Sequence, residues 1–314
     1  MKIRFLTACG LFYCVVAFAQ TKTSLSTLSP ATIQLKNPEP PPENYSGGLF
    51  RHFEVIDERP DTARIGIHYS LLRFGKPQNQ QLVFTAPAAQ TISGYLDQYF
   101  TRPDAPYTIL IVMRNLWLSD ARPSREEKTR LRLRMEVYAT RDSLYMPLYR
   151  LDTLLVSWHN HTYDITTVYS IWDKHLTSVF NEIADRASTL VQQKQGQVHL
   201  VSRDEIEQFN HSRFDHPIDV HPLTPGVYAS FDEFKSNTPS IKEFEIKMEG
   251  AKRILYIREN GNYYYSHNAW GYCDGKNVFI MRDGALRPTW REGKAWYLDT
   301  MQIHTLDMDN GAIY

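Results

Sequence analysis

The stretch RLRLRMEVYA, residues 130–139, decides the fold class of this chain. In an extended chain its residues alternate between two sides. The apolar side contains Leu131, Leu133, Met135 and Val137, and the charged side contains Arg130, Arg132, Arg134 and Glu136. Because successive side chains of a β-strand point to opposite faces, the pattern predicts a strand with one buried and one solvated face. The arginines form a basic stripe, which we interpret as a solvated sheet face, with an anionic contact as the alternative.

Further strands are predicted on both sides of this stretch. YTILIVMRNLWL, residues 107–118, is almost continuously apolar and rich in strand formers, which favours a central strand. A third strand is expected over about 148–158. Earlier in the chain, HFEVIDERPDTARIGIHYS, residues 52–70, contains two short β-like runs around a polar turn.

Two amphipathic helices are predicted from apolar residues at three- and four-residue steps. One spans about 87–100, with Pro87 suited to its first turn. The other begins near Val168, includes His175 in its apolar stripe and ends near Gln195. The order of strands and helices predicts an α+β domain over residues 49–198, sandwich-like, with the helices on one face of the sheet.

The chain changes character twice after this domain. Residues 199–224 are polar and contain His and Pro, and we interpret them as a linker. From 225 to 314, CDGK, RDGA and REGK punctuate short runs rich in Tyr, Trp, Val and Ile. Asp-Gly and related pairs tolerate the positive φ of hairpin turns, so this module is predicted to be mostly β, a meander of short antiparallel strands.

The N-terminus predicts export. Lys2 and Arg4 precede an apolar run, and Ala17-Phe18-Ala19 forms a small-x-small cleavage pattern, so residues 1–19 read as a signal peptide. The apolar run is shorter than the roughly 20 residues of a membrane-spanning helix, and no later segment reaches that length. Residues 20–48 are rich in Ser, Thr and Pro and are interpreted as a disordered tether.

Lipidation is the alternative at the N-terminus. Leu6-Thr7-Ala8-Cys9 resembles the signal that places a lipidated cysteine at the mature end. Processing there would leave an apolar core of only Phe5–Ala8, whereas about 7 residues is the usual minimum.

Composition excludes two classes of partner. The chain has 35 basic and 35 acidic residues, which argues against nucleic-acid binding and against a polybasic membrane anchor. The mature length suits two modest domains.

Cys273 is the one cysteine left in the mature chain if Cys9 and Cys14 leave with the signal peptide. A nucleophilic cysteine needs a nearby cation or helix N-terminus and a histidine base. The sequence neighbours of Cys273 are Tyr272 and Asp274, and an anion raises the pKa of a thiol. We therefore expect a packed side chain without an internal disulfide.

The best metal candidate is SWHNHTYD, residues 157–164. His159 and His161 share one side of a strand, and Asp164 adds a carboxylate. Two or three ligands fall short of a closed site, and a polar turn before the long helix is the competing interpretation.

Aromatic residues of the C-terminal module form a candidate binding surface: Tyr264, Trp270, Trp290 and Trp296. Aromatic platforms stack on sugars or anchor protein interfaces. The two-residue alternation of strands predicts that about half of these aromatics point into the core.

Two stretches carry resemblances. VIDERPDTARIG, residues 55–66, resembles the opening of YajG-like envelope lipoproteins, in which an Asp-x-Arg and an Ile-Gly flank a turn before a helix and a sheet. GVYASFDEFKSNTPSI, residues 226–241, with WGYCDGKNVFI, residues 270–280, is similar to a C-terminal module of uncharacterised exported bacterial proteins. This second resemblance implies a domain boundary near 222 and transfers no catalytic residue.

Together these observations predict an exported protein of the bacterial envelope, periplasmic, outer-membrane-associated or extracellular. The leading hypothesis is a non-enzymatic binding or assembly component whose partner is an envelope protein or a glycan. A carbohydrate-binding module or glycan-acting hydrolase is the first alternative, and a metal- or thiol-dependent enzyme is the second. The sequence has no Gly-rich phosphate loop, G-x-S-x-G elbow or H-E-x-x-H, and it indicates no cofactor.

Overall fold

The computed structural model describes residues 25–35, 48–70, 78–121, 126–140, 143–160, 165–193, 199–212, 215–300 and 302–314. The expected signal peptide, with Cys9, lies outside these residues. The α+β prediction is confirmed: the chain is 24% helix and 46% strand, and the strands form two sheets.

The first sheet contains the predicted strands. Its members are β1 (Pro30–Thr32), β2 (Phe50–Asp57), β3 (Gly66–Ser70), β4 (Gln78–Val83), β5 (Tyr107–Ala121), β6 (Glu126–Thr140) and β7 (Tyr145–Asn160). The spatial order is β1-β4-β3-β5-β6-β7, and β2 pairs in parallel with the first half of β5. The long strands β5, β6 and β7 form an antiparallel meander in the middle and at one edge of the sheet.

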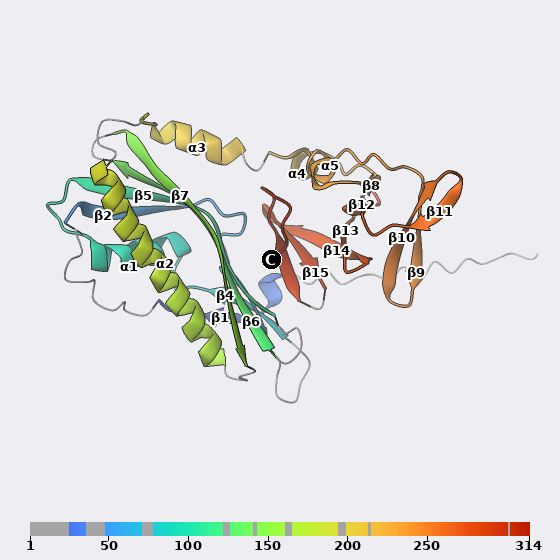
Figure 1. Ribbon diagram of the computed structural model, residues 1–314, viewed down its shortest axis with the longest axis horizontal. Helices are drawn as coiled ribbons and strands as arrows, with labels where there is room; N and C mark the ends of the chain where they lie inside the picture. The colour runs from blue at the N-terminus through green and yellow to red at the C-terminus, as the bar shows by residue number, and fades with distance from the viewer. Residues whose placement is uncertain are drawn as a thin grey trace, which may run out of the picture.

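Two helices, α1 (Ala88–Phe100) and α2 (Ile165–Gln193), cover one face of this sheet, as predicted (Figure 1). The apolar residues of β6 belong to the same core as the apolar stripes of both helices. Leu133 and Met135 pack there with Ile92 of α1 and Trp172 of α2, all fully buried. Alternation in the strands and helical spacing in the helices therefore meet in one hydrophobic core.

The other face of β6 corrects one expectation. Arg132 and Arg134 are buried, not solvated, because the C-terminal module lies against this face (Figure 1). Arg130 is half-buried. The alternative interpretation of the basic stripe, contact with anionic groups, holds for Arg134, whose anionic partners belong to the same chain.

Part of the expected tether is also corrected. Residues 25–35 contain a 3₁₀ turn, Leu25–Thr27, and strand β1, which pairs in parallel with β4. Leu25 and Ile33 are buried. These few apolar side chains, spaced among polar residues, each find a place in a core, and this burial together with the β1–β4 pairing offsets the ordering cost of a short segment.

The segment expected as a linker carries two helices, α3 (Arg203–Ser212) and α4 (Pro217–Val220). Ile206 of α3 packs on Leu110 and Val112, on the face of the sheet opposite to α1 and α2. Within the described ranges, no helix is long and apolar enough to cross a bilayer.

The C-terminal module is rich in strands, as predicted. It contains β8 (Gly226–Tyr228), α5 (Phe231–Lys235), β9 (Phe244–Glu249), β10 (Lys252–Glu259), β11 (Asn262–Tyr265), β12 (Gly271–Cys273), β13 (Val278–Arg282), β14 (Ala285–Glu292), β15 (Ala295–Asp299) and β16 (Ile303–Leu306). The pairs β12–β13, β13–β14 and β14–β15 are antiparallel neighbours along the chain. Asp283 and Gly284 both have positive φ, 50° and 69°, which explains the Asp-Gly pair at that turn.

Phe234 is the centre of the module's core. Its ring stacks on Trp270 at 4.4 Å and meets the rings of Trp296 and Tyr228 edge-on at 5.4 and 5.6 Å. Ser230 caps α5 by accepting the N–H of Glu233, which holds Phe234 in place. The residues that carry the second resemblance are therefore mostly packing residues.

We expect Ile33→Ala to lower the free energy of unfolding by about 2–5 kcal/mol, because it removes buried methyl groups from the main core. Gln34→Ala, at an exposed neighbour, should change it by less than about 0.5 kcal/mol. Urea denaturation of the protein starting at Gln20 checks both values. Equal stabilities of the two variants would mean that the segment is a tether after all.

Candidate functional site

Cys273 is a packed core residue. It is fully buried, and its sulfur accepts a hydrogen bond from the N–H of Gly275 at 3.2 Å. Burial raises the pKa of the thiol, and the carboxylate of Asp274 acts in the same direction, outweighing the Gly275 N–H and the Tyr228 hydroxyl. A nucleophilic cysteine requires a lowered pKa and access, so this thiol lacks the environment for catalysis.

The metal hypothesis falls mostly outside the described residues. The backbone of His159 lies in β7, but its side chain is not described, and His161 and Asp164 lie in an undescribed range. Across the described part of the chain, no group of three or more His, Cys, Asp or Glu side chains is placed to hold a metal ion. The metal site stays a prediction.

A serine and a histidine do meet under α2. Ser157 Oγ lies 2.8 Å from His175 Nε2, and burial lowers the pKa of His175, with a smaller effect from Lys174. A nucleophile–base pair also needs a third group that orients the base. Among the described residues Ser157 is the hydrogen-bond partner of His175, and the pair has the form of a satisfied histidine at the edge of the core.

The candidate aromatic residues divide into two groups. Trp296 is buried and Trp270 is half-buried in the Phe234 core, while the half-buried Trp290 stacks on Tyr297 at 5.7 Å where the module meets the first sheet. Tyr264 is 53% exposed. Of the four candidates, Tyr264 is therefore the one with an exposed side chain, and the three tryptophans pack inside the module or where it meets the first sheet.

Tyr264 forms one wall of an open groove of about 510 Å³ at the free end of the module. The apolar floor consists of Ile241, Ile257 and Ala269, and we call the whole depression the Tyr264 groove. Polar side chains line its rim: Glu259, His267 and Asn268. Its volume lies within the range of sites that hold small ligands or a few residues of a peptide.

The hairpin β10–β11 fixes the position of Tyr264. Asn260 and Gly261, with φ of 51° and 85°, form its tight turn, and Ile257 pairs with Tyr264, so both side chains share a face. Tyr265, the next residue of the strand, also lines the groove, and its hydroxyl donates to the carbonyl oxygen of Gly284 at 2.9 Å. The groove is thus built on paired strands and not on a free loop.

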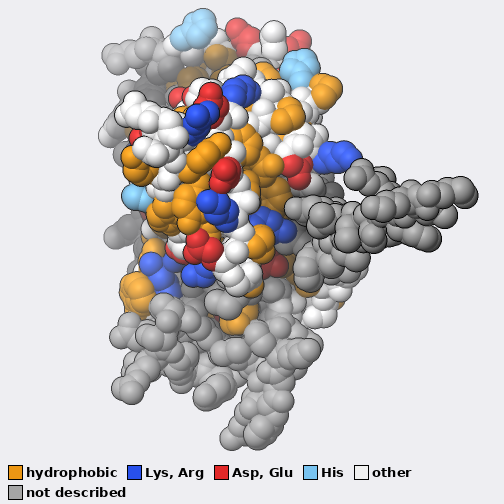
Figure 2. Space-filling view, turned by 90° about the vertical axis from the view of Figure 1, so that its right-hand side faces the viewer, with side chains coloured by type: hydrophobic (Ala, Val, Ile, Leu, Met, Phe, Trp, Pro, Cys, Tyr) orange, Lys and Arg blue, Asp and Glu red, His pale blue; other side chains and the backbone are white. Residues whose placement is uncertain are grey.

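The surface around the groove is mixed in character. Figure 2 views the molecule from this end and shows hydrophobic side chains gathered in the middle of the described face, between Lys, Arg, Asp and Glu side chains. An apolar centre with a polar rim is the usual anatomy of a recognition site. Chemically, the tyrosine offers a stacking face, and the carboxylate, imidazole and amide offer hydrogen bonds.

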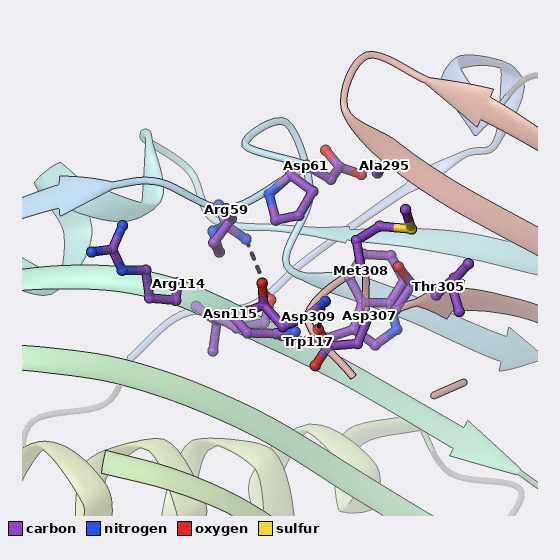
Figure 3. Close-up of a pocket in the computed structure, with 13 residues that line it drawn as sticks. Arg59, Asp61, Arg114, Asn115, Trp117, Ala295, Thr305, Asp307, Met308 and Asp309 are labelled. Atoms are coloured by element: carbon purple, nitrogen blue, oxygen red, sulfur yellow. Dashed lines mark hydrogen bonds between the residues drawn. The ribbon is translucent and has the colours of Figure 1, made fainter. Parts of the chain in front are cut away.

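A second cavity lies between the two modules but has little room. Arg59, Asp61 and Trp117 from the first domain meet Asp307 and Asp309 around it (Figure 3). Its volume is about 30 Å³, enough for about two water molecules. The guanidinium of Arg59 is engaged by the carboxylate of Asp57 at 2.7 Å and by backbone carbonyls, so this cavity belongs to a structural joint.

The joint is held by buried polar contacts around an apolar patch. Arg134 pairs with Asp307 at 3.0 Å and with Asp309, and the hydroxyl of Tyr297 donates to Asp61. Beside these contacts, Trp117 packs with Tyr297 and with the buried Leu25. Ion pairs, a hydrogen bond and apolar packing therefore all contribute to the interface between the two modules.

Comparisons with known proteins do not assign a family. No protein-family model matches the chain, and no curated protein matches it. Among solved structures, protein XCC0632 from Xanthomonas campestris, described under family model DUF330, is similar at a TM-score of 0.38 and 13% identity, over 52% of this chain and 98% of that one. A second, described as an uncharacterized protein, has a TM-score of 0.29 and 9% identity, over 50% and 97%.

These neighbours carry no argument about the site. Both are uncharacterised, and the scores are low. The resemblances to YajG-like lipoproteins and to the exported C-terminal module stay predictions.

The sequence reasoning missed the polar rim of the groove. Glu259, His267 and Asn268 flank the tyrosine run in RENGNYYYSHN, residues 258–268. The Asn-Gly pair signals a hairpin, and polar residues on either side of an aromatic strand are the signal that would have placed them around Tyr264.

Arg134→Met should lower the free energy of unfolding by about 3–5 kcal/mol, because it leaves the buried carboxylate of Asp307 without its counter-charge. Arg150→Met, at an exposed arginine 3.9 Å from Asp152, should change it by less than about 0.5 kcal/mol. Denaturant titration of both variants is the measurement. A neutral Arg134→Met would show that the ion pairs do not hold the joint.

Proposed function

We propose that the protein is an exported, non-enzymatic binding component of the bacterial cell envelope, and that the Tyr264 groove holds its protein partner. The observation that carries the proposal is the pair of exposed tyrosines, Tyr264 and Tyr265, that line the groove from a strand at the end of the second sheet. Large aromatics exposed on a rigid strand supply binding energy at low conformational cost.

The placement of other groups supports a binding role. The thiol is buried, the small cavity between the modules has room for water alone, and Arg134 of the basic stripe is used in the joint. The groove, in contrast, lies at the free end of the module, with its polar side chains directed to solvent. A docked first domain then acts as a support that presents the groove.

A second candidate partner is a glycan. The exposed ring of Tyr264 beside the carboxylate of Glu259 and the amide of Asn268 combines stacking with hydrogen bonds to hydroxyl groups, which is the chemistry that sugars require. This candidate differs from the first in its ligand, not in its site.

Export is supported by the N-terminal pattern of charged, apolar and small residues. Cleavage after Ala19 predicts that the form found in the cell-envelope fraction begins at Gln20. The intact mass of that form checks this prediction. A mass that fits a lipidated Cys9 would replace cleavage by anchoring, and an uncleaved chain in the cytoplasm would refute export.

The partner is tested with a photo-crosslinking amino acid placed at Tyr264 in living cells. We expect one dominant envelope protein to be captured from this position, and none from the same group at Phe209, an exposed aromatic on α3. Tyr264→Ala should weaken binding of the identified partner by about tenfold or more, as expected for a central aromatic contact.

Other outcomes of that experiment are equally clear. Retention of the purified protein on cell-wall glycan, lost with Tyr264→Ala, would assign the groove to a glycan. Neither a position-specific adduct nor glycan retention would refute the binding role of the groove.

A further inference from the structure

The edge strand β7 exposes a second surface, remote from the Tyr264 groove. Leu154, Val156 and Trp158 alternate along it and are 44%, 37% and 56% exposed; we call them the β7 surface. β7 is the terminal strand in the order of the first sheet. In the described part of the chain, its outer edge is paired by a single bridge between Tyr145 and Val201, at its beginning.

Sheet edges are normally protected from other chains by charges, prolines or bulges. The first half of β7 follows this rule, since it contains Pro147, Arg150 and Asp152. The second half, Thr153–Trp158 with sequence TLLVSW, carries no charge. This contrast within one strand indicates that the unprotected half is available to pair with another chain.

The two faces of β7 differ in their surroundings. Leu151 and Leu155 pack against the core under α2. Leu154, Val156 and Trp158 point the other way, to the face on which the C-terminal module sits, and the module leaves them uncovered. A straight row of apolar side chains beside unpaired backbone groups is complementary to an extended polypeptide.

Positive charge next to this row has no acidic partner among the described side chains. Lys128 lies over the ring of Trp158 at 4.6 Å, and Arg130 is paired in register with Val156. Burial, and then the positive charge of Arg282 from the C-terminal module, lower the pKa of Arg130. Among the described residues, neither Arg130 nor Arg282 has an acidic partner, whereas Arg132 and Arg134 both do.

We propose that the β7 surface receives an extended segment of a partner protein as an added strand, with apolar residues beside Leu154 and Trp158 and an acidic residue opposite Val156. A strand added at about 4.8 Å would satisfy the open edge of β7. Val156 is short, so the guanidinium of Arg130 reaches across it toward a carboxylate on the added strand. The charge of Arg282 strengthens the same preference for an acidic segment.

This inference is independent of the proposed function, because the β7 surface belongs to the first domain and the Tyr264 groove to the second. It also depends on the docked arrangement of the modules, since Arg282 contributes to the cationic side. The partner defined here is a strand-forming segment with an acidic residue between two apolar ones at two-residue spacing.

The test uses a random nonapeptide library selected against the mature protein that begins at Gln20. The recovered peptides should carry an acidic residue between two apolar ones at two-residue spacing, which places all three on the face of Leu154, Val156 and Trp158. Their affinity should fall by about tenfold or more in Val156→Glu, which places a like charge opposite the acidic residue of the added strand, and in Arg130→Gln, which removes the cation. Arg150→Gln, on the protected half of the same strand, is the matched control and should leave the affinity unchanged.

Hydrogen exchange distinguishes strand addition from side-chain contact alone. Binding should slow exchange of outward-facing amides between residues 153 and 158. Peptides that bind Val156→Glu as well as the native protein, or that show no excess of acidic residues, would overturn the proposal. Slowed exchange elsewhere in the protein would also overturn it. So would a library that yields no peptide while the protein binds phosphatidylglycerol vesicles in an Arg130-dependent way, because that result would assign the surface to an anionic membrane.

Discussion

The architecture depends on the ion pairs of one buried side chain, the guanidinium of Arg134, which lies between the two modules. Arg134 projects from the middle of β6 and meets carboxylates that lie near the end of the sequence, at Asp307 and Asp309. A buried arginine without counter-charges would be strongly unfavourable, so the C-terminal module can cover this face only in an orientation that brings its carboxylates to Arg134. Apolar packing of Trp117 with Tyr297 contributes area, while the ion pairs specify the register of the two parts.

This constraint explains how the protein distributes its polar residues. The motif around Asp57, Arg59 and Asp61 lies at the joint, where Arg59 ties the turn to β5 and Asp61 accepts from Tyr297. Gly66 follows in a strand so close to β5 that a Cβ atom would lie 2.1 Å from the carbonyl oxygen of Leu118. What the sequence presents as a conspicuous charged motif is thus a structural element of the joint.

The sequence predicted the elements better than it predicted their environment. Period-two alternation in residues 130–139 and helical spacing after Val168 are local signals, so the strands, the helices and the face they share were readable. The sequence did not show that the second face is covered by the C-terminal module. A solvated arginine and a buried arginine look the same in a sequence, and the partners of Arg134 are 173 and 175 residues away. For the same reason Leu25 and Ile33 read as part of a tether, although each fits a distant core.

The candidate site shows a similar division. Alternation predicted that some aromatics of the C-terminal module would point inward, but not that the tryptophans would take the interior places and Tyr264 the exterior one. That outcome depends on α5, which places Phe234 between Trp270 and Trp296. A periodic pattern does not reveal which rings a short helix will cover.

The distance in sequence between Arg134 and its partners also has a meaning in time. A ribosome adds about 5–20 residues per second, so Arg134 is made on the order of ten seconds or more before Asp307. If the first sheet forms in that interval, α1 and α2 cover one face, and the face that carries Arg134 is covered only where α3 packs on Leu110 and Val112. In such a nascent chain, the basic stripe of β6 would be the solvated face that its sequence predicts. Arg132 and Arg134 would become buried only after the C-terminal module has been made and has docked.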